Sequence, residues 1–164
     1  MPDSKKLNKN DSHNTNKKEK SFQLLLRVRF AECDSQKIVF NARYGDYVDV
    51  AATEYFRALF GGYEKLIDQG IDYQVVRLST EWKSPAKFDD VISITVETVK
   101  TGNTSFVMQF DFTDPETGRE IASAEQICVM VTAGDHQKLP IPDNIRALLE
   151  RGAPGIVANY SGIN

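Results

Sequence analysis

Histidine is scarce in this 164-residue sequence, and its scarcity excludes several kinds of site. The two histidines, His13 and His136, both lie in polar stretches without a helix or strand pattern. A Ser-His-Asp or Cys-His arrangement needs an ordered imidazole beside the nucleophile, and a zinc site needs clustered His or Cys ligands. The sequence offers neither, so we expect no metal and no cofactor.

Cysteine is equally rare, because Cys33 and Cys128 are the only two and cannot make a disulfide framework. Both lie in apolar, strand-like contexts, where we expect free thiols packed as small hydrophobic groups in a reducing cytoplasm. Cys33 could be read as a thiol nucleophile, but no histidine lies near it to activate it.

Long apolar runs are missing too, and no stretch approaches the ~20 residues that span a membrane. The net charge of −3 gives no reason to expect nucleic acid or an acidic membrane as a partner. Residues 1–20 carry six lysines against three acids and have no apolar segment. We expect a disordered tail over 1–20, one domain over 21–152, and a loose C-terminal tail over 153–164.

The sequence does contain the periodicity of one long helix and several strands. Residues 42–60 place apolar side chains on one broad arc, and Gly61-Gly62 follows as a helix stop. This order of elements predicts an α+β fold in which one curved antiparallel sheet of about five strands wraps around a long central helix. Strand patterns cover residues 21–30, 72–84, 91–99, 104–113 and 119–132, and shorter helices are expected at 63–69 and 144–151.

The stretch ECDSQKIVFNARY, residues 32–44, joins the first strand to the long helix. It places Asp34 seven residues before Asn41, a residue type favoured at helix N-caps. The start of a helix has backbone N–H groups without partners, which favour negative charge. A carbonyl held between the two could be attacked by Asp34, or by water with Asp34 as general base, while the N–H groups stabilise the oxyanion.

This stretch resembles the hotdog-fold thioesterases of the 4-hydroxybenzoyl-CoA thioesterase type. The residues that carry the resemblance are Cys33-Asp34, Ile38-Val39-Phe40 and Tyr44, and it extends more weakly over residues 22–150. The resemblance implies an enzyme that hydrolyses an aryl- or acyl-CoA thioester to the free acid and CoA. It also implies homodimers or homotetramers with active sites at the subunit interface.

The resemblance also implies roles for single residues. Asp34 matches the catalytic carboxylate, the backbone N–H of Asn41 matches the group that polarises the thioester carbonyl, and Asp49 looks like a second acid found in many relatives. Aromatic stripes on helices are more often core, and we expect Phe56 there. The residues expected to contact the substrate are Val39, Phe40, Tyr44, Tyr47 and Trp82.

Three departures from the family pattern leave an alternative open. Lys37 stands where a glycine is common, Asn41 stands where many relatives have histidine, and Gly102-Asn103-Thr104 replaces a basic cluster that binds CoA phosphates in some members. The missing basic cluster and Lys37 are the reasons for the alternative, a non-catalytic protein of the same fold that binds acyl-CoA or an aromatic ligand. The candidates for phosphate binding, which the sequence does not rank, are Lys37, Arg77, Lys83, Lys87 and Lys100.

Overall fold

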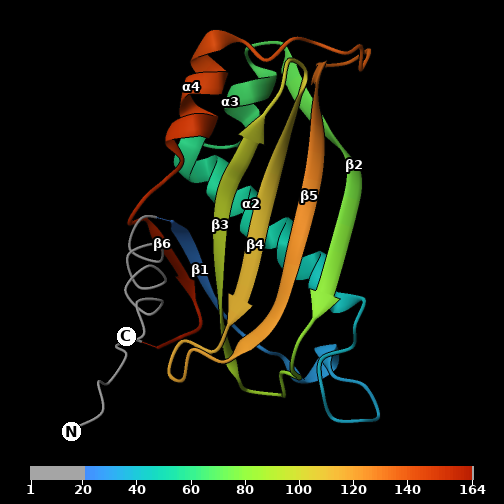
Figure 1. Cartoon of the computed structure of the whole chain (residues 1–164), viewed down its shortest axis with the longest axis vertical. Helices are drawn as coiled ribbons and strands as arrows, with labels where there is room; N and C mark the ends of the chain where they lie inside the picture. The colour runs from blue at the N-terminus through green and yellow to red at the C-terminus, as the bar shows by residue number, and fades with distance from the viewer. Residues whose placement is uncertain (1–20, 164) are drawn as a thin grey trace, which may run out of the picture.

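One long helix lies across the concave face of a six-stranded sheet (Figure 1). The structure is a computed structural model and describes residues 21–163, so the tail expected at 1–20 lies outside the described residues. The strands are β1 Phe22–Arg27, β2 Ile71–Trp82, β3 Val91–Thr101, β4 Ser105–Thr113, β5 Glu120–Thr132 and β6 Val157–Tyr160. The helices are the 3₁₀ turn η1 Phe30–Glu32, α2 Arg43–Phe60, α3 Tyr63–Ile67 and α4 Asp143–Arg151.

The core is the interface between α2 and the inner face of the sheet. Alternate side chains of β4 point inward, so that Phe106, Met108, Phe110 and Phe112 are at most 1% exposed. Phe56 packs among them, with its ring 6.1 Å from that of Phe106, so its predicted place in the core is confirmed. The buried helix residues match the predicted apolar arc and are Tyr44, Tyr47, Val48, Ala51, Ala52, Tyr55, Phe56 and Leu59.

Helix α2 begins later than the sequence suggests. Asn41 is not its N-cap; Ala42 holds that position, and no side chain caps the helix. The reason is a tight turn ahead of it, in which the N–H groups of Arg43 and Tyr44 donate to the carbonyls of Phe40 (2.9 Å) and Asn41 (3.4 Å). Gly61 ends the helix in the left-handed conformation, φ 84°, as predicted for a glycine stop.

The strand order is β2-β5-β4-β3-β1-β6, and all neighbours are antiparallel except β1 and β6. The α+β class is confirmed, but the sheet has one strand more than the five predicted and is mixed. The expectation of a loose tail over 153–164 is wrong for Val157–Tyr160, which pairs in parallel with residues 23–26. These four residues are too few to show a strand pattern, and the open edge of β1 supplies the pairing that orders them.

Strand β2 forms the other edge of the sheet. Its side away from β5 has no partner strand among the described residues, and the strand carries a bulge between Val75 and Arg77. Four large apolar side chains are exposed along this edge: Val75, Val76, Leu78 and Trp82. None of the helices between residues 21 and 163 is long and apolar enough to cross a membrane.

Candidate active site

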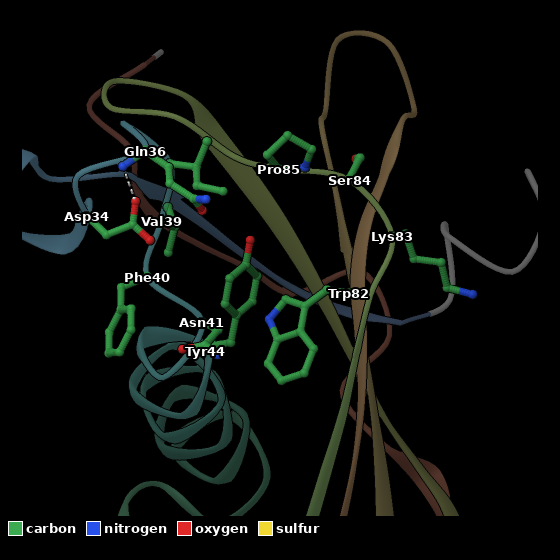
Figure 2. Close-up of a pocket in the computed structure, with 11 residues that line it drawn as sticks. Asp34, Gln36, Val39, Phe40, Asn41, Tyr44, Trp82, Lys83, Ser84 and Pro85 are labelled. Atoms are coloured by element: carbon green, nitrogen blue, oxygen red, sulfur yellow. Dashed lines mark hydrogen bonds between the residues drawn. The ribbon is translucent and has the colours of Figure 1, made fainter.

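A cleft of about 560 Å³ lies where the loop before α2 meets the end of β2. Figure 2 shows Asp34 and Gln36 on one side, Trp82 and Lys83 on the other, and Asn41 at the start of α2 between them. Six of the eight predicted site residues line it. The full lining is Asp34, Gln36, Ile38, Val39, Phe40, Asn41, Tyr44, Trp82, Lys83, Ser84 and Pro85.

Asp34 is half-buried and fixed by its own loop. Its N–H donates to the carbonyl of Ile38 and its carbonyl accepts from the N–H of Lys37, both at 2.9 Å. One carboxylate oxygen, Oδ1, accepts from the N–H of Gln36 at 2.8 Å (Figure 2). The other oxygen, Oδ2, has no hydrogen-bond partner among the described residues. A carboxylate held in this way keeps one oxygen available as a base or a nucleophile.

The backbone at Lys37 explains why glycine is common at this position in the family that the sequence resembles. Lys37 has φ 63°, in the left-handed region that glycine adopts without steric cost. This conformation costs about 1 kcal/mol for a residue that has a Cβ atom.

Asn41 presents a free donor to the cleft. Its backbone N–H has no acceptor within residues 21–163, and it lies beside the first turn of α2, where the helix dipole is positive. The Asn41 side chain is exposed and makes no hydrogen bond in the same range. The main-chain N–H is therefore available to a carbonyl oxygen that develops negative charge.

Tyr44 and Trp82 form an apolar wall of the cleft. Their rings meet edge to face at 6.2 Å, and the other side of Tyr44 packs on Phe112 at 5.6 Å. Tyr44 is buried, and burial raises the pKa of its phenol, although the main chain of Ala86 and the charge of Arg119 act in the opposite direction. The wall is therefore uncharged and suits an apolar acyl group.

Glu32 is the most important residue that the sequence analysis missed. Its carboxylate is 5% exposed and accepts from the Arg29 N–H (2.7 Å), the Arg29 guanidinium (2.7 and 2.8 Å) and the Tyr47 hydroxyl (2.7 Å). Burial raises the pKa of Glu32, but the hydrogen bonds from Arg29 and Tyr47 outweigh it and the pKa is lowered overall. Its carbonyl accepts from the Phe40 N–H at 2.9 Å, so Glu32 joins both ends of the loop that carries Asp34. The only sequence signal was the three-residue spacing from Arg29.

Two predicted site residues lie away from the cleft. Tyr47 is buried beneath the loop, where its hydroxyl donates to Glu32, so it does not line the cleft within one chain, and its contact with the substrate stays a prediction. Asp49 is exposed on α2 and is also absent from the lining, so one chain alone does not bring the two predicted acids together.

Arg119, also missed, fixes the opposite wall. Its guanidinium donates to Ser84 Oγ at 2.7 Å and to the carbonyl of Pro85 at 2.8 Å. Its charge is balanced by Asp114 at 3.8 Å and Asp90 at 4.0 Å. A partner 35 positions away along the chain leaves no local pattern in the sequence.

The thiols contribute no visible site. Cys33 is half-buried and Cys128 is buried, both are free, and burial raises the pKa of Cys128 to about 12. Within the described part of the chain, no group of three His, Cys, Asp or Glu residues is placed to hold a metal ion.

Sequence comparisons show which family the chain resembles. The family described as the Thioesterase-like superfamily matches residues 28–149. The acyl-CoA thioester hydrolase YbgC of Escherichia coli O6:H1 is 25% identical over 118 residues, which cover 72% of this chain and 85% of that protein. A putative esterase of Aquifex aeolicus is 29% identical over 84 residues, which cover 51% of this chain and 66% of that protein.

Solved structures show the same architecture. The gentisyl-coenzyme A thioesterase BH1999 superposes with a TM-score of 0.67 at 27% identity, covering 77% of this chain and 98% of that one. A thioesterase-superfamily protein of Jannaschia sp. CCS1 has a TM-score of 0.75 at 24% identity, covering 82% of this chain and 94% of that one, which shows a shared fold.

The family match spans well over half of the chain, and the six-stranded sheet around α2 is the expected hotdog architecture. The prediction of a hotdog-fold thioesterase is confirmed, while the narrower 4-hydroxybenzoyl type stays a prediction. The chain belongs to the Thioesterase-like superfamily of thioester hydrolases.

Proposed function

We propose that this protein hydrolyses an aryl- or acyl-CoA thioester to the free acid and CoA in the cleft between Asp34 and Trp82. The observation that carries the proposal is that one cleft holds two groups without hydrogen-bond partners among the described residues. They are Asp34 Oδ2, an acceptor, and the Asn41 N–H, a donor. Two relatives are named for this chemistry, an acyl-CoA thioester hydrolase and a gentisyl-CoA thioesterase.

In the proposed reaction the thioester carbonyl accepts a hydrogen bond from the Asn41 N–H, which stabilises the oxyanion as the carbonyl is attacked. Asp34 acts in one of two ways. As a nucleophile, its oxygen bonds to the carbonyl carbon, the carbon–sulfur bond breaks to release CoA thiolate, and water hydrolyses the resulting anhydride. As a general base, it takes a proton from the water that attacks the carbonyl, and the carbon–sulfur bond then breaks to release CoA thiolate, which takes up that proton. An acyl-enzyme trapped by rapid acid quench during a single turnover selects the first route.

We propose further that two copies of the chain associate along β2, as the resemblance implies for homodimers and homotetramers. An unpaired edge strand with exposed apolar side chains is a surface for strand pairing. Trp82 ends this strand and Lys83 follows it, and both line the cleft, so a second chain placed there would complete the site. Asp49 can act as a second acid only if such an interface brings it to a cleft. The free thiols fit the expected cytoplasmic location.

The test is a panel of aryl- and alkyl-CoA thioesters, incubated with the protein while released thiol is measured. The proposal predicts turnover of at least one member. Thermal stabilisation by CoA esters with no thiol release from any of them would support the non-catalytic binding protein instead.

A further inference from the structure

Gln126 is a buried polar side chain that the proposed reaction does not use. It is 6% exposed, and its Oε1 atom has no hydrogen-bond partner among the described residues. Its cross-strand neighbours, Leu78 on β2 and Met108 on β4, have apolar side chains that offer no donor. A buried acceptor without a donor costs on the order of 1–3 kcal/mol, and a donor from outside the chain would relieve this cost.

The inner face of the sheet leads from the active-site cleft to Gln126. Cross-strand partners share one face of a sheet, and Trp82, which lines the cleft, pairs with Ala122 on β5. The next side chain of β5 on this face is Ala124, and the one after it is Gln126. At roughly 3.3 Å per residue, Gln126 is about 13 Å along β5 from Ala122. Gln126 is therefore the first side chain larger than alanine on this path along β5.

Helix α2 leaves the same path open on the side that faces β2. Gly45 lies one helical turn after Asn41, about 6 Å along the axis. A Cβ atom at Gly45 would lie 4.0 Å from Leu78 Cδ2, so the helix has no side chain where it faces Leu78. Leu78 and Trp82 belong to the inner face but are 42% and 53% exposed, and in Figure 2 the Trp82 ring lies between the start of α2 and β2. The space that follows the Asn41 N–H is therefore bordered by apolar side chains of β2 and by a helix turn without a side chain.

We infer that Gln126 is a specificity-determining residue, whose Oε1 accepts a hydrogen bond from a hydroxyl group at the far end of the acyl group; this inference rests on the proposed function. With its carbonyl at the Asn41 N–H, the acyl group extends past Gly45 along β2. Trp82 and Leu78 contact its carbon skeleton, and Gln126 contacts its end. A site with a buried hydrogen-bonding group discriminates against an analogue without the matching group, because that analogue leaves the buried group unpaired.

The test compares kcat/KM for thioester pairs that differ in one hydroxyl group. The pairs are phenylacetyl-CoA with 4-hydroxyphenylacetyl-CoA, and hexanoyl-CoA with 6-hydroxyhexanoyl-CoA. We expect the parent to prefer the hydroxylated member of at least one pair about tenfold, the effect of one buried hydrogen bond. Gln126→Met keeps the length of the side chain but removes the acceptor, so it should abolish this preference. Gln109→Met, on the outer face of β4, is the matched control and should retain it.

Gly45→Ala tests the path separately from the acceptor. The added methyl group makes an ordinary contact with Leu78, and alanine favours a helix by about 1 kcal/mol over glycine, so the melting temperature should rise. The same methyl group narrows the path, so kcat/KM should fall for the preferred hydroxylated thioester and fall less for acetyl-CoA, whose acyl group ends before Gly45. A general loss of folding does not produce this combination.

Equal kcat/KM for both members of each pair in the parent would overturn the inference. A hydroxyl preference that survives Gln126→Met, or that disappears equally in Gln109→Met, would overturn it as well. If no thioester is hydrolysed, the proposed function fails, and calorimetric binding of the same pairs tests the inference alone. Tighter binding of the hydroxylated member that Gln126→Met abolishes would then support the inference, and equal binding of both members would overturn it.

Discussion

The position of Asp34 depends on Glu32, two residues earlier. Glu32 holds the loop from both ends, through its carboxylate to Arg29 and Tyr47 and through its carbonyl to Phe40. Because it is buried and fully hydrogen-bonded, we regard it as a positioning residue that does not touch the substrate. Loss of the Glu32 charge should therefore displace Asp34 and also lower the stability of the fold.

Glu32→Gln should lower the free energy of unfolding by about 1.5–3 kcal/mol at pH 7, the usual value of hydrogen bonds to a charged group. The folded pKa of Glu32 lies below its ordinary value of 4.5, so this stability is present above that pH and is lost as the pH falls through the folded pKa. The free energies of unfolding of parent and variant, measured with denaturant from pH 7 to 3, check this pH dependence. A difference between parent and variant that grows as the pH falls would contradict it.

The same variant should lower kcat with a smaller change in KM, because it disturbs the reacting group more than the apolar wall. Tyr47→Phe removes one of the same hydrogen bonds and should act in the same direction. Equal kcat in parent and both variants, measured under conditions where all are folded, would show that Asp34 is held without Glu32.

Gln126 is a buried amide on the inner face of β5, with its cross-strand neighbours Leu78 and Met108 on either side. Its Oε1 has no hydrogen-bond partner among the described residues. An unsatisfied buried acceptor is costly, so Gln126→Met should raise the free energy of unfolding by about 1 kcal/mol. Gln109→Met, where the amide already binds Asp111, is the matched control and should give no gain. Destabilisation by Gln126→Met would reveal a partner for the amide in the native assembly.

At the scale of elements, β6 adds a sixth strand beside β1 and becomes the edge of the sheet on that side. The family match ends at residue 149, before this strand, and β2 forms the opposite edge, where its side away from β5 has no partner strand among the described residues. The two edges differ in length, because β6 has 4 residues and β2 has 12, so the β2 edge offers more backbone groups for pairing with a second chain.

Truncation after Gly155 removes β6 and should lower the free energy of unfolding by at least about 1 kcal/mol, because β1 loses its parallel partner. Activity per folded molecule should change little, since no residue of β6 lines the cleft. Truncation after Gly162 keeps β6 and serves as the control. Equal melting temperatures for the two truncations would mean that β6 does not stabilise the sheet.

The sequence predicted long elements well and short or capped ones poorly. The arc of α2 and the strands β3 to β5 were predictable because many residues repeat one period. The motif residues from Asp34 to Tyr44 could be assigned to one cleft because they are close in sequence. Glu32 and Arg119 were not predicted, since their roles arise from contacts that only the folded chain creates. The four residues of β6 and the start of α2 depend on neighbours rather than on local propensity.

At the scale of the whole molecule, the exposed apolar edge of β2 predicts self-association. Val76 is 60% exposed there, and Val76→Lys should block pairing because a charge on an edge strand opposes it. Light scattering should show a dimer or larger for the parent and a smaller species for the variant, with kcat/KM falling in parallel. Val99→Lys, on β3 at 52% exposure, is the matched control. A parent that is monomeric at working concentration and fully active would contradict the shared site.

The central claim is that Asp34 supplies the reacting oxygen in the cleft. Asp34→Asn keeps the size of the side chain and the acceptor for the Gln36 N–H but removes the charge on the free oxygen. The measurement is kcat/KM for the best CoA thioester of the panel, with the melting temperature as a check on folding and Asp49→Asn as the comparison. We predict a loss on the order of 100-fold or more for Asp34→Asn and a smaller loss for Asp49→Asn. A folded Asp34→Asn variant that hydrolyses the thioester as fast as the parent would contradict the claim.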